Sequence, residues 1–183
     1  KSVPVSAEVR ELLGLPDDTT AMAPNDLLKA ILSAKVDLLY NGGIGPYIKA
    51  RTESHGQVGD RANDAIRVDG RQVQARIIGE GGNVGMTQRG RIEAAANGVI
   101  LNTAAIDNSA GVDTSDREVN IKILLGILER DGRLDRPARD ELLQSMTDEV
   151  AVQVLRDNYE QNVLLGNSRA NATVMLPVHE RLM

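Results

Sequence analysis

The chain has 183 residues, 42% of them hydrophobic, which predicts one domain, or one domain and a small part of another. A formal net charge of -5 argues against nucleic acid and acidic membranes as partners, because both require a basic surface. The sequence has no cysteine and only two histidines, which lie far apart. This composition excludes thiolate and disulfide chemistry and argues against a histidine-rich metal site, so we expect no metal.

No segment has the length and apolar character of a membrane span, and no signal peptide is visible, so we expect a cytoplasmic protein. The sequence begins with lysine instead of methionine, which we interpret as a piece cut from a longer polypeptide. Phe and Trp are absent, so the chain offers no aromatic platform for stacking bases.

The first third of the chain predicts helices that feed into strands. Segment 6–13 is expected to be a helix, with Ser6 as its N-cap and Gly14 as its end. A second helix is expected over 24–34, and it leads directly into an apolar strand at 36–40. Such a short link between helix and strand is typical of α/β units.

The next segments are less regular. Residues 44–50 are predicted to begin another helix, and the polar stretch 52–64 is interpreted as a solvated loop with a short helix rather than a site. His55 is expected to be a surface histidine, and its role is left open. Asp69-Gly70, between alternating apolar flanks, predicts a β-hairpin that leads into a second core strand at 75–78.

The second half predicts one more strand and then helices. Thr87 can cap a helix that ends before Gly98, and residues 99–101 form the third strand, with a possible extension over 104–106. Ser115 begins the next helix, since Ser-Asp-Arg-Glu is a capping box. Further helices are expected over 137–146 and 148–165, with a break at Gly166. We therefore divide the chain into an α/β part, residues 1–114, and a helical segment, residues 115–183, that packs on it.

Three predicted strands end in Gly and Asn residues. In parallel sheets, ligands bind just beyond the carboxyl ends of the strands. Glycine allows close approach to the backbone, and asparagine offers both a donor and an acceptor. The resulting candidate rim consists of Asn41-Gly42-Gly43, Gly79-Glu80-Gly81-Gly82-Asn83 and Asp107-Asn108-Ser109-Ala110-Gly111-Val112.

Recognised catalytic motifs are absent. The segment GEGGNVG departs from the dinucleotide signature, because Val84 stands where its third glycine is required, and no Walker loop is present. No catalytic dyad or triad is evident, and the internal lysines, Lys49 among them, are interpreted as solvated charges. Three parallel strands without a diphosphate cradle are consistent with the second half of a doubly wound, Rossmann-like domain whose first half lies upstream.

Three segments resemble the large bacterial NAD-specific glutamate dehydrogenases, namely LLYNGGIGPYIKARTESHGQVGDRANDAIRVDGR, RIIGEGGNVGMTQRGRIE and DNSAGVDTSDREVNIKILL. The resemblance covers nearly the whole chain. A weaker resemblance reaches the smaller glutamate dehydrogenases, whose late NAD-domain strands end in patterns like EGAN and NAGGV. The chain departs from these patterns at Gly82, where Ala is usual, and at Ser109-Ala110, where Ala-Gly is usual.

The resemblance implies an NAD-dependent oxidative deamination of L-glutamate to 2-oxoglutarate and ammonia. It implies that Asn83 contacts the nicotinamide ribose side, with Gly81 in the same cofactor-binding loop, and that Asn108 meets the nicotinamide carboxamide. Val112 and Ser115 would line the glutamate pocket. Asn41 is placed on the cofactor rim by topology rather than by a shared motif.

The family's catalytic Lys and Asp belong to an upstream domain and have no match here, so we expect no catalytic residue in this chain. We expect the fragment to be inactive alone, and the full-length protein to be a homo-oligomer. The alternative is a non-catalytic α/β module whose C-terminal helices serve assembly or regulation.

Overall fold

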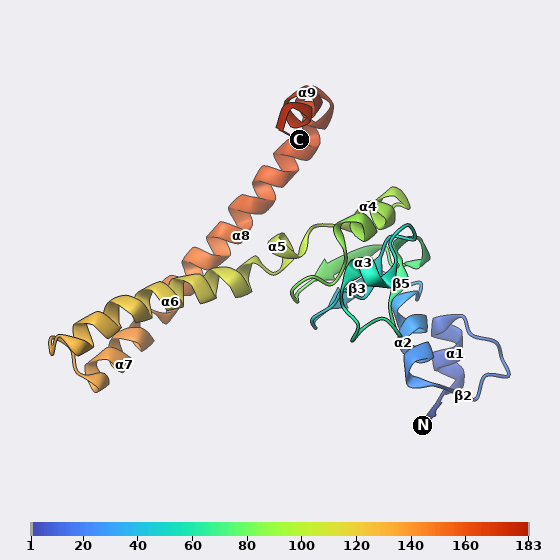
Figure 1. Ribbon diagram of the computed structural model, residues 1–183, viewed down its shortest axis with the longest axis horizontal. Coiled ribbons are helices and arrows are strands. Elements are labelled where there is room, and N and C mark those ends of the chain that lie inside the picture. Colours follow the sequence, from blue (N-terminus) through green and yellow to red (C-terminus); the bar gives the residue numbers. More distant parts are fainter. Residues whose placement is uncertain (1, 183) are drawn as a thin grey trace. The chain divides into compact units, whose positions relative to one another are not determined.

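The computed structural model describes residues 2–182 (Figure 1). The chain is an α/β protein with two compact units, of which the first ends at Asn108 and the second begins at Ser109. The sequence prediction placed its boundary after residue 114, which lies inside the first helix of the second unit. Among residues 2–182, no helix combines the length and the apolar character that a membrane crossing requires.

The first unit opens with a small antiparallel sheet. Strand β1 (Val3–Pro4) pairs with β2 (Ala21–Met22), and helix α1 (Ala7–Leu13) lies between them in the chain. The Ser6 side chain accepts from the Val9 N–H, and Gly14 ends the helix at φ 62°. Both predicted caps are thus confirmed. Helix α2 (Pro24–Leu32) follows and leads towards the central sheet.

The central sheet is parallel and ordered β3-β6-β7, as the three apolar runs predict. Its strands are β3 (Leu38–Asn41), β6 (Ile77–Glu80) and β7 (Ile100–Leu101). Helix α4 (Gln88–Ala96) connects β6 to β7, and Thr87 caps it by accepting from the Gly90 N–H. Because the strands are parallel, their carboxyl ends and the loops that follow lie at one edge of the sheet.

Two sequence predictions fail at the neighbouring strand pair. Strand β4 (Ile48–Lys49) replaces the helix expected over 44–50, and it pairs in parallel with β5 (Val68–Asp69). No hairpin forms at Asp69-Gly70, because the Asp69 N–H donates to Gln72 Oε1 at 2.8 Å and a 3-10 turn, η1 (Gly70–Gln72), follows. A Cβ at Gly70 would lie 2.6 Å from the Gly90 carbonyl oxygen, so this glycine serves close packing on α4. The short helix α3 (His55–Val58) lies in the predicted solvated stretch.

The core of the first unit lies between the two parallel sheets and α4. Ile48, Ile78 and Met86 are its largest fully buried apolar side chains. Lys49 is also buried, at 9% exposure, so its interpretation as a solvated charge is wrong. The remaining apolar members of this core are Leu32, Val68, Val73, Ala75, Ala94 and Val99.

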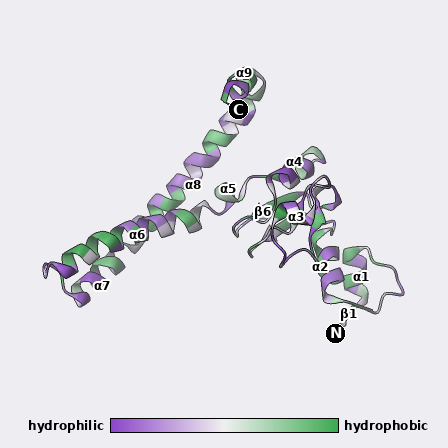
Figure 2. Cartoon of the chain, viewed as in Figure 1, coloured by the Kyte–Doolittle hydropathy of each residue, from purple (hydrophilic) through white to green (hydrophobic). Residues whose placement is uncertain are grey.

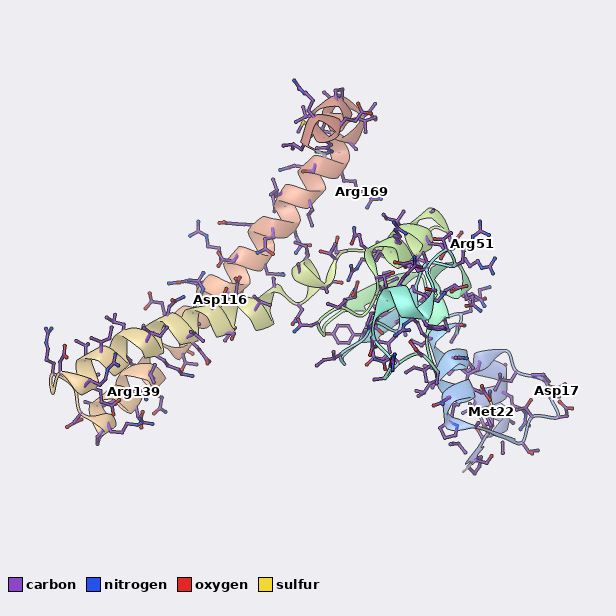
Figure 3. The ribbon with its side chains drawn as sticks, in the orientation of Figure 1. Asp17, Met22, Arg51, Asp116, Arg139 and Arg169 are labelled. Carbon is purple, nitrogen blue, oxygen red and sulfur yellow. The ribbon has the colours of Figure 1, made fainter. Side chains whose placement is uncertain are left out.

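After β7, the predicted strand extension is a single helical turn, α5 (Ala104–Asp107), at the carboxyl edge of the sheet. The second unit is helical throughout its described residues. Its helices are α6 (Ser109–Arg130), α7 (Arg136–Ser145), α8 (Thr147–Ala170) and α9 (Ala172–Leu182). Figure 2 shows hydrophobic and hydrophilic residues alternating along α6 and α8, and Figure 3 shows the side chains, with Asp116, Arg139 and Arg169 marking α6, α7 and α8.

Two helix boundaries differ from the prediction. Ser115 is not an N-cap, because α6 begins six residues earlier and the capping-box sequence lies inside the helix. Thr114 Oγ1 donates to the Ala110 carbonyl oxygen at 2.7 Å, as a helix-interior threonine does. Gly166 does not break α8, which continues to Ala170. Helix α6 is held on α8 in part by Arg117, which donates to Gln153 Oε1 at 2.6 Å and to Asp157.

Candidate functional site

The candidate site of the first unit is formed by the loops that follow β3, β6 and β7. The first two loops are rich in glycine and pack directly on each other. The Gly82 N–H donates to the Asn41 carbonyl oxygen at 2.9 Å, and the Tyr47 N–H donates to the Gly85 carbonyl oxygen at 2.8 Å. A Cβ at Gly82 would lie 2.3 Å from the carbonyl oxygen of Gly43. The backbones therefore approach so closely that only glycine fits at this point.

Glu80, the last residue of β6, anchors the second loop from inside. Its side chain is fully buried, and its carboxylate accepts from Arg91 Nε at 2.5 Å and from Arg91 Nη2 at 2.8 Å. Oxygen Oε2 also accepts from the Met86 N–H at 3.2 Å. A buried carboxylate needs such a bidentate partner. The pair thus ties the start of the loop to its end and to α4.

Asn83 and Asn108, predicted from separate motifs, are brought together. The Asn108 Nδ2 atom donates to Asn83 Oδ1 at 2.8 Å, across 25 positions of sequence. Asn83 is exposed and Asn108 half-buried, and neither makes a further side-chain bond to any residue between 2 and 182. The pair therefore offers a ligand one amide donor, on Asn83, and one amide acceptor, on Asn108.

Asn41, also predicted on the rim, is only 6% exposed. Its side chain lies under the second loop, since a Cβ at Gly85 would come within 2.9 Å of Asn41 Nδ2. This buried Nδ2 has no hydrogen-bond partner within the described part of the chain. Gly81 follows β6 directly, and the hydroxyl of Tyr40 occupies the space where its Cβ would be. The structure thus puts Asn41 beneath the rim and Gly81 at it.

Val112 and Ser115, the two residues predicted for substrate binding, belong to the second unit. They stand three positions apart on α6, so they share one face of that helix. Both are exposed, Val112 at 48%. The i, i+3 spacing therefore allows both side chains to contact one ligand.

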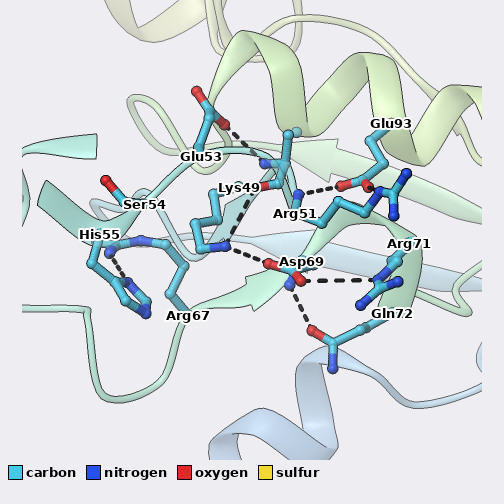
Figure 4. A network of polar contacts seen from close by, with 12 residues as sticks. Lys49, Arg51, Glu53, Ser54, His55, Arg67, Asp69, Arg71, Gln72 and Glu93 are labelled. Atoms are coloured by element: carbon cyan, nitrogen blue, oxygen red, sulfur yellow. Dashed lines mark hydrogen bonds and ion pairs between the residues drawn. The ribbon is translucent and has the colours of Figure 1, made fainter. Parts of the chain in front are cut away.

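A second polar cluster surrounds β4 and β5 (Figure 4). The Arg67 side chain is fully buried and donates to the Pro46 and Asp60 carbonyl oxygens at 2.8 and 2.6 Å, and to the Asp64 carboxylate. Arg67 Nη1 lies 2.8 Å from His55 Nδ1, which identifies that ring nitrogen as the acceptor. His55 is thus an exposed surface histidine, as expected, with a buried arginine as partner.

The same cluster explains the acidic residues in the polar stretch. The Asn63 side-chain amide donates to Asp60 Oδ2 at 2.6 Å and lowers the pKa of the Asp60 carboxyl below its ordinary value, with the Ala62 N–H and Arg67 acting in the same direction. Lys49 Nζ bonds to Asp69 Oδ1 at 2.5 Å and joins β4 to β5. Within residues 2–182, no group of three His, Asp or Glu side chains is arranged to hold a metal ion.

Sequence reasoning missed the Glu80–Arg91 pair, the burial of Arg67 and a contact of Asp107. The Asp107 carboxylate accepts from the Glu80 N–H at 2.9 Å and from Asn102 Nδ2 at 3.4 Å. For Glu80 a signal existed, namely a glutamate at the end of a predicted core strand. A charged side chain is rarely buried unless it is paired, so this position predicts a buried cationic partner. Arg67 and Asp107 lie inside the segments that carry the resemblance, but the sequence carries no signal for the groups with which they pair.

Comparisons with known proteins agree on one family. A family model described as bacterial NAD-glutamate dehydrogenase, catalytic domain, matches residues 1–168. A protein from Mycobacterium tuberculosis named NAD-specific glutamate dehydrogenase is 56% identical over 183 residues, which cover 98% of this chain and 11% of that protein. Proteins of the same name from Halomonas elongata and Pseudomonas aeruginosa are 50% and 45% identical and are matched over 90% and 100% of this chain. The chain thus spans about a tenth of the length of these relatives.

Proposed function

Because this chain belongs to the bacterial NAD-glutamate dehydrogenase catalytic-domain family, we propose that it carries the nicotinamide side of a site that oxidises L-glutamate to 2-oxoglutarate and ammonia. The observation that carries the proposal is the bonded pair of Asn83 and Asn108 at the carboxyl edge of a parallel sheet. Family membership supplies the reaction, and the amide pair supplies a place in this chain where the cofactor would be read.

The residues present fit NAD at this edge. Its nicotinamide ring carries a carboxamide, which has one acceptor oxygen and an NH₂ donor. The amide donor of Asn83 and the amide acceptor of Asn108 are complementary to these two groups. Gly81 is proposed to belong to the same cofactor-binding loop, where the absence of a side chain makes room for the Tyr40 hydroxyl. When bound, NAD supplies the hydride acceptor, while the chain's own residues bind and orient it.

We further propose that the sheet is the second half of a doubly wound, Rossmann-like domain within residues 1–114. The sequential order β3-β6-β7 with a helical crossover supports this reading. The half that would hold the pyrophosphate is then contributed by another part of the polypeptide. Asn41, with its unpartnered buried amide, is proposed to complete the cofactor rim from beneath the loop.

On the substrate side, we propose that Val112 and Ser115 of α6 contact the side chain of glutamate. Ser115 begins the predicted helical segment 115–183, and Val112 lies one helical turn before it. Their shared helix face supports a joint role, with Val112 packing on methylene groups and the Ser115 hydroxyl donating to the distal carboxylate. A hydrogen bond to a charged group contributes about 1.5–3 kcal/mol when water is excluded. The exposed apolar side chains of α8, such as Leu155 and Tyr159, support a homo-oligomer in the intact protein.

The test measures glutamate-dependent NADH formation by the intact polypeptide. Wild type is compared with Ser115→Ala and with Ser145→Ala, a control that makes the same change at an exposed serine of the same unit. Ser115→Ala is expected to raise the KM for glutamate about tenfold, while the KM for NAD stays constant.

Three results are informative. If wild type forms no NADH from glutamate, the proposed reaction is wrong. If wild type is active and Ser115→Ala behaves as Ser145→Ala does, the reaction stands and Ser115 has no part in the pocket. If Ser115→Ala raises the KM for glutamate and leaves the KM for NAD unchanged, both the reaction and the pocket assignment stand.

A further inference from the structure

Asp107 opens the third segment of the candidate rim, and its carboxylate contacts both the end of β6 and the loop after β7. It is the last residue of the single turn α5, and Asn108 follows it directly. Strand β7 ends at Leu101, opposite Ile78, so no residue of β7 pairs with Glu80. The Glu80 N–H therefore needs another acceptor, and Asp107 Oδ2 provides it at 2.9 Å.

The other carboxylate oxygen of Asp107, Oδ1, accepts from the loop that follows β7. Asn102, the first residue after β7, donates from Nδ2 to Asp107 Oδ1 at 3.4 Å. One carboxylate thus bridges the end of β6 to the loop after β7. The backbone of α5 is held by its own bonds, from the Asp107 N–H to Thr103 at 3.1 Å and from the Asn108 N–H to Ala104 at 2.8 Å.

This bridge determines where Asn108 lies. The turn α5 has no side-chain cap at Thr103, and a single helical turn is unstable by itself. The Asp107 carboxylate joins α5 to β6 through the Glu80 N–H at 2.9 Å. Asn108 follows this junction directly, and its Nδ2 atom donates to Asn83 Oδ1 at 2.8 Å.

We propose that Asp107 is a positioning residue for nicotinamide recognition. It acts by fixing Asn108 against Asn83. This inference rests on the proposed function and adds a residue to it. Asp107 itself is not proposed to touch the cofactor, because its two oxygens already accept from Glu80 and Asn102. Its effect must therefore pass through Asn108, and this gives the proposal a distinctive signature.

The test is a double-mutant cycle in the intact polypeptide, with Asp107→Ala, Asn108→Ala and the double variant. Steady-state kinetics are measured with NAD and with its 3-acetylpyridine analogue, which keeps the ring carbonyl and lacks the amide NH₂. Asp107→Ala is expected to raise the KM for NAD about tenfold, to leave the KM for glutamate unchanged and to affect the analogue less. The double variant is expected to match Asn108→Ala, because the two residues act in series.

Two further variants control for folding. Asp107→Asn keeps the shape and one acceptor oxygen, so its effect should lie between wild type and Asp107→Ala. Asp26→Asn makes the same chemical change at an exposed carboxylate of α2 and should behave as wild type. Thermal unfolding of each variant separates a misfolded protein from a mispositioned amide.

The outcomes distinguish this inference from the proposed function. A wild type that forms no NADH from glutamate overturns both. If wild type is active and the effects of Asp107→Ala and Asn108→Ala add, the positioning role alone is overturned. The same holds if Asp107→Ala raises the KM values for glutamate, NAD and the analogue equally. The positioning role is established if Asp107→Ala raises only the KM for NAD and has no further effect when Asn108 is already alanine.

Discussion

At the scale of the residue, burial decides which polar groups matter in this protein. Glu80 and Arg67 are charged side chains with 0% exposure, and each is held by several hydrogen bonds. Removing one partner of a buried pair leaves an unpaired charge, which costs about 3–5 kcal/mol. These residues therefore shape the two Gly-rich loops and the polar cluster at β4 and β5, although the sequence did not reveal that their side chains are buried.

The Asp60 carboxyl gives a pH-dependent prediction. Its pKa is held below the ordinary value, first by the Asn63 side chain. A carboxyl whose pKa is lowered by folding contributes stability that is complete above its ordinary pKa of 3.8 and is lost as the pH falls through the lower folded-state value. Asn63→Ala should thus lower the unfolding midpoint at neutral pH, and its difference from wild type should shrink under acid conditions.

Thermal unfolding at neutral pH and at a series of acid pH values would check this prediction. Asn25→Ala is the matched control, since Asn25 is exposed in the first turn of α2. A difference between wild type and Asn63→Ala that stays constant down to the most acid pH would contradict the role assigned to Asp60.

At the scale of the element, the glycines of this chain divide into those that permit close packing and those that do not. Gly82 faces the Gly43 carbonyl oxygen with no room for a Cβ, whereas Gly126, inside α6, has no atom within 4 Å of that position apart from its own helix. The same substitution should therefore have opposite effects at the two sites.

Gly82→Ala is expected to destabilise the protein by about 1–3 kcal/mol and to raise the KM for NAD, because the loop that carries Asn83 must shift. Gly126→Ala is expected to stabilise it by about 0.5–1 kcal/mol, since alanine favours a helix interior. Chemical denaturation of both variants, together with NAD kinetics in the intact polypeptide, provides the measurement. Equal stability of the two variants would show that the two loops do not pack as described.

At the scale of the whole molecule, the chain contains a parallel sheet with three strands and a helical unit, and it spans about a tenth of its relatives. We expect the isolated 183-residue chain to form no NADH from glutamate and to bind NADH more weakly than micromolar. The reason is that the family resemblance assigns the catalytic Lys and Asp, and the adenosine side of the cofactor site, to other parts of the polypeptide. Fluorescence titration of the isolated chain with NADH checks this, with the intact polypeptide as control, and micromolar affinity would refute it.

The sequence by itself determined the class of the fold, the three strands of the parallel sheet and the family. Apolar runs such as Ile100–Leu101 and caps such as Ser6, Gly14 and Thr87 act locally, so their effect is visible in the residues themselves. The motifs around Asn83 and Asn108 also identified two residues that the fold joins, although they are 25 positions apart.

Where local signals conflict with packing, only the tertiary structure decided which conformation forms. Asp69-Gly70 has a hairpin sequence but begins a 3-10 turn against α4, and the capping box at Ser115 lies inside a longer helix. Lys49 is buried because Asp69 neutralises it, and Asp107 joins the end of β6 to the loop after β7 because β7 ends early. Where a contact distant in sequence decides the outcome, as for Lys49 with Asp69, the free energy of burying and pairing that contact exceeds the preference of the local segment.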